Sequence, residues 1–191
     1  MPTIVAISGS LRRKSFNTML LNAVAVATPS GTTIEIASIR DIPLYDGDLD
    51  PASAALAPVR DLKERIASAD GLLLATPEYN HSIPGVLKNV IDWVSRPATD
   101  IGRIFGGKPA AIVGATTGGG GTILAQAAWL PVLRALGTLP FFGKRVIVSN
   151  AAKVFSADGR LEDAVVRTQV EAFSVGFAEF VARHRLEADR S

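Results

Sequence analysis

The stretch GLLLATPEYNHSIPGVLKNVIDWV, residues 71–94, places an apolar run, a polar segment and a helical pattern in direct succession. Its first five residues form a short continuous apolar run, which predicts a strand buried on both faces. From Gly85 onward the apolar residues recur at the spacing of one helix face. Between them, residues 76–84 hold two prolines, a carboxylate, a phenol, an amide and an imidazole. A buried strand that leads through a loop into a helix is the repeating unit of a parallel α/β sheet.

The same alternation of strand and helix recurs along the chain. Five short apolar runs predict strands, and a helical pattern follows each of them. This alternation predicts a flavodoxin-like three-layer sandwich around a five-stranded parallel sheet in the order 2-1-3-4-5. Nothing divides the sequence, so we expect one domain over residues 1–191. The predicted strands are 4–7, 33–36, 71–75, 110–115 and 145–149, and the predicted helices cover about 16–27, 58–68, 85–96, 122–136 and 161–180.

The composition excludes several classes of functional site. The 191 residues include no cysteine and only two histidines, His81 and His184, so neither a thiolate site nor a histidine-built metal site is expected. A net charge of +2, with basic and acidic residues interspersed, argues against binding to nucleic acid. No apolar run reaches bilayer length, and the first residues lack the pattern of a signal peptide. We therefore expect a cytoplasmic protein that does not bind membranes.

Three unusual loops are expected to meet at one end of the predicted sheet. In the order 2-1-3-4-5, a crevice opens between the first and third strands at their carboxyl ends. The loops that reach this crevice are 8–15 and 77–84, with 116–121 beside them. We therefore expect the ligand site at this place.

The first loop has the chemistry of a phosphate site. Gly9, Ser10, Arg12, Ser15 and Asn17 lie between the first strand and the first helix. A helix start offers unpaired N–H groups and the positive end of a dipole, and arginine adds a charged fork. Helix capping explains Ser15 alone and explains the other side chains poorly. Neither G-x-G-x-x-G nor G-x-x-x-x-G-K-[ST] occurs here, so the phosphate is not expected to belong to a Rossmann dinucleotide or to ATP or GTP.

The second loop is stiff and polar. Pro77 and Pro84 restrict its backbone at both ends, which suits a surface that must hold a flat ring with donors and acceptors along its edge. A flavin is such a ring. Tyr79 could then cover a ring face, and Asn80 could meet the ring edge.

Three other side chains of this loop have open roles. Glu78 could accept a hydrogen bond from the ring, or could pin the loop to a neighbouring N–H group. Ser82 could contact the ligand or be a plain turn residue. We assign no catalytic role to His81, because a single loop histidine is usually solvated.

The third loop, TTGGGG at 116–121, can bring backbone amides close to a ligand because glycine lacks a Cβ atom. Such amides could stabilise negative charge on a ring. A flexible surface loop is the alternative. The ligand-binding interpretation is better for Thr116 to Gly119 than for the last two glycines.

Four blocks of sequence carry a resemblance to a known family. They are GSLRRKSFN at 9–17, IPLYDGDLD at 42–50, TPEYNHSIPGVLKNVIDWVSRP at 76–97 and KVFSADGRL at 153–161. With these blocks, the sequence resembles the NAD(P)H-dependent FMN reductases, the branch with quinone, chromate and azo-dye reductases. One departure is the segment after Thr117, which is unusually rich in glycine.

The resemblance implies a flavodoxin-like fold, bound FMN, and NADPH or NADH as electron donor. It also implies a homodimer or homotetramer. It places the phosphate at the first loop and the ring between the second and third loops. The candidate cofactor-binding residues are Ser10, Arg12, Ser15, Phe16, Asn17, Pro77, Glu78, Tyr79, Asn80, Ser82, Thr116, Thr117 and Gly118.

This resemblance implies an oxidoreductase with a two-step, ping-pong reaction. NAD(P)H is expected to give hydride to flavin N5 and to leave, after which a quinone, chromate, an azo compound or a similar small acceptor takes the electrons at the same face. No side chain need act as acid or base, since the cofactor carries the chemistry. The alternatives are a flavodoxin-type electron carrier, a flavin-binding regulatory module, and a reductase that uses FMN as a diffusible substrate.

Overall fold

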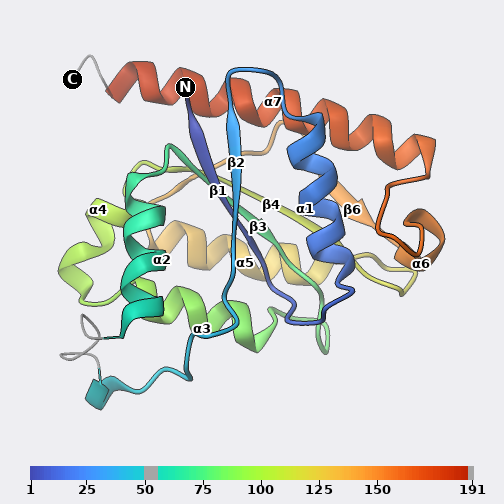
Figure 1. Cartoon of the computed structure of the whole chain (residues 1–191). Coiled ribbons are helices and arrows are strands. Elements are labelled where there is room, and N and C mark those ends of the chain that lie inside the picture. Colours follow the sequence, from blue (N-terminus) through green and yellow to red (C-terminus); the bar gives the residue numbers. More distant parts are fainter. Residues whose placement is uncertain (50–55, 189–191) are drawn as a thin grey trace.

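A computed structural model describes residues 1–49 and 56–188 of the chain. A parallel sheet lies between two layers of helices (Figure 1). The strand order is β2-β1-β3-β4-β5, with β6 also paired to β4, which confirms the predicted order 2-1-3-4-5. The strands are β1 (Thr3–Ser8), β2 (Thr33–Ala37), β3 (Gly71–Ala75), β4 (Pro109–Ala115), β5 (Leu139–Pro140) and β6 (Val146–Val148).

The helices cover both faces of the sheet because both faces are apolar. Along β1, Ile4 and Ala6 pack into one helical layer, while Val5 and Ile7 pack into the other. The first layer contains α1 (Phe16–Ala27), α6 (Ala151–Val154) and α7 (Ala164–Ala188). The second contains α2 (Ala57–Ser68), α3 (Gly85–Val94), α4 (Ile101–Phe105) and α5 (Ile123–Ala135), with the 3₁₀ turn η2 (Ala98–Asp100) before α4.

The fifth strand differs from its prediction. A single strand at 145–149 was expected, but two short segments, β5 and β6, both pair with β4 and are separated by residues 141–145. At the start of this interruption, Phe141 turns its ring into a cluster on α7, with ring centroids 5.9 Å from Phe173, 5.6 Å from Phe177 and 5.4 Å from Phe180. The Phe141 N–H still donates to the Ala110 carbonyl of β4 at 2.7 Å, so pairing with β4 ends after this residue and resumes at β6.

The segment before the gap in the described residues lies along α3. Asn89 donates from Nδ2 to the Pro43 carbonyl at 2.7 Å and accepts at Oδ1 from the Tyr45 N–H at 2.7 Å. The buried Trp93 ring also donates to Pro43, at 2.8 Å, and meets Tyr45 edge-on at 4.9 Å. Asn89 therefore holds residues 43–45 against α3 through both atoms of its amide. Asp50, the last residue of the IPLYDGDLD block, lies outside the described residues.

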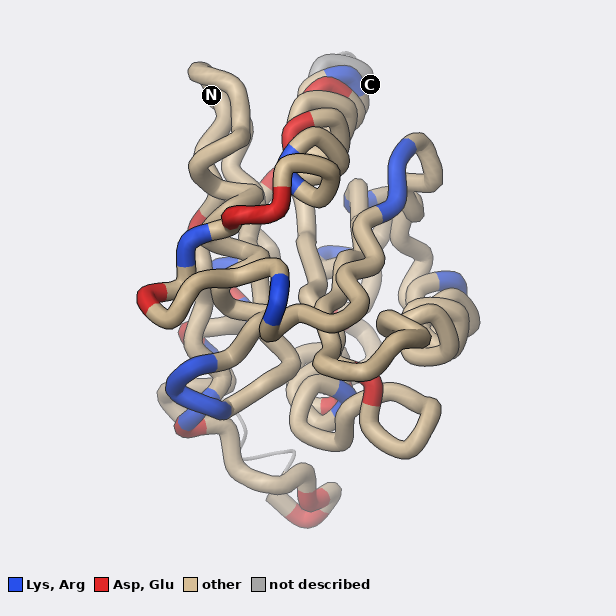
Figure 2. The backbone as a smooth tube through the Cα atoms, turned by 90° about the vertical axis from the view of Figure 1, so that its right-hand side faces the viewer, with Lys and Arg blue, Asp and Glu red and all other residues tan. Residues whose placement is uncertain are grey.

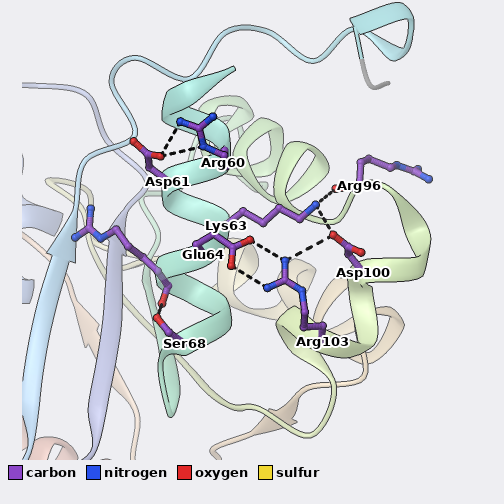
Figure 3. A network of polar contacts seen from close by, with 9 residues as sticks. Arg60, Asp61, Lys63, Glu64, Ser68, Arg96, Asp100 and Arg103 are labelled. Carbon is purple, nitrogen blue, oxygen red and sulfur yellow. Dashed lines mark hydrogen bonds and ion pairs between the residues drawn. The ribbon is translucent and has the colours of Figure 1, made fainter. Parts of the chain in front are cut away.

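A network of ion pairs, here called the α2–α4 network, joins α2 to the chain that follows α3 (Figure 3). Arg103 pairs with both carboxylate oxygens of Glu64, at 2.9 and 2.8 Å, and lies 3.7 Å from Asp100. Lys63 lies 2.7 Å from Asp100 and also donates to the Arg96 carbonyl. The hydrogen bond from Arg103 lowers the pKa of Glu64, and the one from Lys63 lowers the pKa of Asp100.

Candidate functional site

The loops that follow β1, β3 and β4 lie at the same end of the sheet (Figure 1). The first two are in direct contact. The Gly9 N–H donates to the Ala75 carbonyl at 2.8 Å. A Cβ atom on Gly9 would lie 2.9 Å from the side chains of Leu87 and Pro77 and 3.1 Å from Pro84. Only glycine permits this packing, so the sequence itself fixes how closely the two loops approach.

The first loop leads into α1 through a capped helix start. Ser15 is the N-cap, and its buried hydroxyl accepts from the Thr18 N–H at 3.3 Å. The N–H of Phe16, in the first turn, has no acceptor within the helix, as in any α-helix. The Phe16 ring stacks on the Phe155 ring, with the two ring centroids 6.0 Å apart. Ser15 therefore caps α1, which agrees with the interpretation of this residue as a helix cap. Its O–H group remains available to donate a hydrogen bond.

Two further donors lie on the same loop. The Ser10 hydroxyl accepts weakly from the Arg12 N–H at 3.5 Å, which leaves its hydrogen free to donate elsewhere. Arg12 is exposed, and its guanidinium forms no hydrogen bond or ion pair with any residue that the structure describes. A hydroxyl, an unpaired guanidinium and a helix N-terminus on one loop form a donor set suited to a phosphate.

Asn17 is engaged with the protein backbone. Its Nδ2 donates to the Ala115 carbonyl at 2.9 Å, and its Oδ1 accepts from the Ala115 N–H at 3.0 Å. Both contacts are buried. Asn17 thus ties the first turn of α1 to the end of β4. Only its second Nδ2 hydrogen remains for any other acceptor.

The second loop contains a tight reverse turn. The Tyr79 N–H donates to the Ser82 carbonyl at 3.2 Å, and the Ser82 N–H returns a bond to Tyr79 at 3.0 Å. The two central residues, Asn80 and His81, have positive φ values of 50° and 60°. This is the geometry of a type I′ turn, which is rare for residues other than glycine, asparagine and aspartate. The turn keeps Tyr79 45% exposed at the tip of the loop.

Glu78 joins the second loop to the start of α5. Its Oε2 accepts from the N–H groups of Leu124 at 2.9 Å and Ala125 at 3.1 Å. The N-cap residue Thr122 makes no side-chain capping bond of its own, so Glu78 caps the helix from a distance in sequence. His81 lies 3.4 Å from the other carboxylate oxygen. Of the two roles expected for Glu78, the structure contains the pinning contact.

The third loop is anchored at its beginning and end. The Thr116 carbonyl accepts from Ala151 at 2.9 Å, and the Gly118 carbonyl accepts from Asn150 at 3.0 Å. Gly121 has a φ of 65°, and a Cβ atom there would lie 2.3 Å from Ile147. Residues 117–120 between these anchors are exposed. Within this exposed segment the Gly118 N–H donates to the Thr116 hydroxyl at 3.4 Å. Glu78 of the second loop contacts the helix that follows the segment.

Some supporting residues were missed by the sequence analysis. The buried Thr76 hydroxyl donates to the Pro77 carbonyl at 2.9 Å and accepts from the Trp129 ring at 3.1 Å. A Cβ atom on Gly114 would lie 2.0 Å from the Thr122 hydroxyl, so glycine is required where β4 meets α5. Thr76 and Trp129 are 53 positions apart, and no local pattern indicates their contact.

Charged residues of both signs lie on the surface of the molecule (Figure 2). Acidic and basic residues alternate over the side of the molecule drawn in Figure 2. Within residues 1–49 and 56–188, no group of three or more histidine, aspartate or glutamate residues could hold a metal ion. Among the same residues, no helix is long and apolar enough to span a membrane.

Comparisons with known proteins agree with this arrangement. Residues 2–153 match the family model described as NADPH-dependent FMN reductase. An NAD(P)H-dependent FMN reductase of Pseudomonas aeruginosa is 44% identical over 168 residues, covering 88% of this chain and 89% of that protein. A 2-hydroxy-1,4-benzoquinone reductase of a Burkholderia species is 37% identical and covers 96% and 98%. The solved structure of FerB, an NAD(P)H:acceptor flavoenzyme of Paracoccus denitrificans, has a TM-score of 0.86 at 33% identity and covers 96% and 99%.

Proposed function

The chain belongs to the NADPH-dependent FMN reductase family, and from this premise we propose that it is an FMN-containing reductase of quinones and similar small acceptors. In this proposal residues 1–191 act as one FMN-binding domain, with NADPH or NADH as electron donor. The observation that carries it is the donor set of the first loop, which lies at the same sheet end as the turn of the second loop.

The residues at this end of the sheet fit FMN. Ser10, Arg12 and Ser15 would hold the phosphate with the N–H of Phe16, because their hydroxyls, guanidinium and helix N-terminus all favour an anion. Asn17 would fix the first turn of α1 through its bonds to Ala115. The ring would lie against the second and third loops, with Pro77, Glu78, Tyr79, Asn80, Ser82, Thr116, Thr117 and Gly118 around it.

In this proposal the residues of the chain position FMN and cover part of its ring. When bound, FMN supplies an atom that accepts hydride from the nicotinamide and passes electrons to the second substrate. The type I′ turn fixes the backbone conformation of Asn80 and His81. It would thereby position the side chains of Tyr79 and Asn80 beside the ring. Thr117 is exposed, and its backbone N–H would offer a donor for negative charge that develops at the ring. No side chain has to take up or release a proton in this scheme.

Donor and acceptor would use one site in turn. Initial rates should be measured against NADPH concentration at several fixed quinone concentrations. The double-reciprocal plots should then be parallel lines, and intersecting lines would contradict the ping-pong scheme. The names of relatives favour quinones as acceptors, since one is a 2-hydroxy-1,4-benzoquinone reductase and others are quinone reductases. Chromate and azo compounds are further acceptors to be assayed in the same way.

An anaerobic titration with NADPH tests the reductase proposal. The visible absorption of FMN in the purified protein should bleach within the mixing time of a manual experiment, without any added reductase. A flavodoxin-type carrier or a regulatory module would stay yellow. A reductase that uses FMN as a diffusible substrate would lose its colour on gel filtration before the titration.

The proposal includes self-association and a cytoplasmic location. Large apolar side chains are exposed on α5, at Ile123, Leu124 and Leu130, and on the segment between β5 and β6, at Phe142. Such side chains are typical of an interface between subunits. We propose a homodimer or homotetramer on this ground, with small molecules as its only other partners.

A further inference from the structure

A basic cavity lies beside the first loop, on its β2 side. Its volume is about 280 Å³, and it is formed by residues 8–13, the start of α1 and residues 36–40. Three arginines line it, Arg12, Arg13 and Arg40, and no aspartate or glutamate does. Like charges in one cavity repel each other, so a bound anion would stabilise this arrangement.

The cavity is built from two similar turns on neighbouring strands. Because Ile7 pairs with Ala37, the chain segments that leave β1 and β2 run side by side. On the β1 side the Ser10 hydroxyl accepts from the N–H of Arg12, two residues later, at 3.5 Å. On the β2 side the Ser38 hydroxyl accepts from the N–H of Arg40 at 3.3 Å. Each turn therefore presents one hydroxyl hydrogen and one guanidinium.

Arg40 is held toward the first loop. Its Nη2 donates to the Leu11 carbonyl at 2.6 Å. This bond uses one of five guanidinium N–H groups, so the others remain available to a ligand. Arg13 forms no hydrogen bond or ion pair with any described residue. Leu11, Ile36 and Ile39 add an apolar wall to the cavity.

The single phosphate of FMN does not require all three arginines. The proposed phosphate site uses Arg12 with Ser10 and Ser15, which leaves Arg13 and Arg40 without a role. Neighbouring strands lie about 4.8 Å apart, so the end of β2 is on the order of 12 Å from the gap between β3 and β4. A dinucleotide whose nicotinamide reaches that gap can extend its adenosine to the end of β2.

We propose that Arg13, Ser38 and Arg40 bind the adenosine 2′-phosphate of NADPH, and that this cavity makes the protein prefer NADPH to NADH. The inference rests on the proposed reductase function. NADPH and NADH differ only in this phosphate, and a guanidinium beside a hydroxyl is a strong phosphate site. The apolar wall would contact the adenosine.

The first experiment needs no variant. Isothermal titration of the FMN-saturated protein with 2′,5′-ADP and with 5′-AMP isolates the contribution of the 2′-phosphate. We expect 2′,5′-ADP to bind at least about tenfold more tightly, the range for a charged hydrogen bond. Equal affinities would overturn the proposal. This titration involves no electron transfer, so its failure is distinct from a failure of the reductase proposal, which the NADPH bleaching experiment reports.

The second experiment compares Arg40→Met with Arg134→Met, which removes the same charge from the exposed surface of α5. Arg40→Met should weaken 2′,5′-ADP binding and raise KM for NADPH by about 10- to 100-fold, while KM for NADH changes by no more than about twofold. Arg134→Met should change neither. FMN affinity, measured by fluorescence quenching, should stay close to wild type in both. A large loss of FMN affinity in Arg40→Met, with equal effects on both dinucleotides, would assign Arg40 to the FMN phosphate site and overturn the proposal.

Discussion

The Glu78 carboxylate accepts two backbone hydrogen bonds from the first turn of α5. Glu78→Ala should lower the free energy of unfolding by about 1–2 kcal/mol, because two N–H groups lose a charged acceptor at a helix N-terminus. Urea denaturation of the FMN-free protein measures this change. Glu179→Ala, at an exposed position of α7, is the matched control and should change stability little. An equal, small effect of both substitutions would show that Glu78 does not support the scaffold.

Asn17, in the first turn of α1, and Arg12, on the loop before it, should respond differently to substitution: one should affect stability and the other FMN binding. Asn17→Ala leaves the buried backbone groups of Ala115 without partners, so it should cost about 2–3 kcal/mol of stability. Arg12→Ala should leave stability unchanged and weaken FMN binding by about 1.5–3 kcal/mol, because the exposed guanidinium bonds to no described residue and is proposed to bind the phosphate. Denaturation and FMN titration of both variants check this. Normal FMN affinity in Arg12→Ala would refute its phosphate contact.

Residue types and spacing led to the hypothesis of a phosphate site at this loop, but they did not predict the bonds that each side chain makes within the protein. Ser15, Arg12 and Asn17 are all polar and all close to a helix start, so the sequence suggested one shared role. The structure separates them, because Asn17 meets Ala115, a residue 98 positions away. Thr76 and Trp129 are similarly joined over 53 positions. Pairs of this kind depend on how β3, β4 and α5 pack, and a local pattern contains no information about them.

At the scale of elements, the turn in the second loop is set by two residues with positive φ. His81→Gly should raise the free energy of unfolding by up to about 1 kcal/mol, because glycine at this place removes the Cβ strain and completes a favoured Asn-Gly turn. Thermal denaturation measures the gain. Asn80→Gly, at the other central position, should have less effect, since asparagine already tolerates this conformation. NADPH turnover should survive both substitutions; a large loss in His81→Gly alone would show that the imidazole takes part in the reaction.

The α2–α4 network gives the fold an acid-sensitive contact. Hydrogen bonds from Arg103 and Lys63 hold the pKa values of Glu64 and Asp100 below their ordinary 4.5 and 3.8. The unfolded chain therefore binds protons first as the pH falls. The resulting stabilisation is complete above the ordinary values and is lost as the pH drops through the lowered ones.

Arg103→Gln should test this network. The substitution should cost about 1 kcal/mol or less at neutral pH, because these side chains are largely solvated. The difference from wild type should shrink as the pH falls below the ordinary pKa values of 4.5 and 3.8 and through the lowered ones, and also at high salt. Stability curves against pH for both proteins provide the measurement, with Arg134→Gln as a control for loss of one surface charge. A difference that is independent of pH would contradict the assigned ion pairs.

Elements that consist of one apolar run were predictable, and elements shaped by distant packing were not. The run at 71–75 is long enough and apolar enough to be a strand in any α/β sheet. The fifth strand is divided into β5 and β6, with the ring of Phe141 between them packed against α7, and the order of residues 139–148 does not reveal that contact. The sequence did not predict the short elements η2, α4 and α6, because a segment of fewer than six residues gives no periodic signal.

At the scale of the whole molecule, the strand order determines which loops meet. Because β1 lies between β2 and β3, the loops after β1 and β3 lie side by side at one end of the sheet, with the loop after β4 beside them, and this is where we propose that FMN binds. The alternation of strands and helices predicted a parallel sheet, and the number of five strands favoured the order 2-1-3-4-5 over the other common order of such sheets. The contacts from Gly9 to Pro77 and Pro84 then hold the first two loops together, and Glu78 connects the second loop to α5.

A crystal structure of the protein saturated with FMN tests the central claim most directly. The claim predicts phosphate density within hydrogen-bonding distance of Ser10, Arg12 and the N-terminus of α1. It also predicts ring density between residues 77–82 and 116–118. Density for FMN at any other place, or none at saturating concentration, would contradict it.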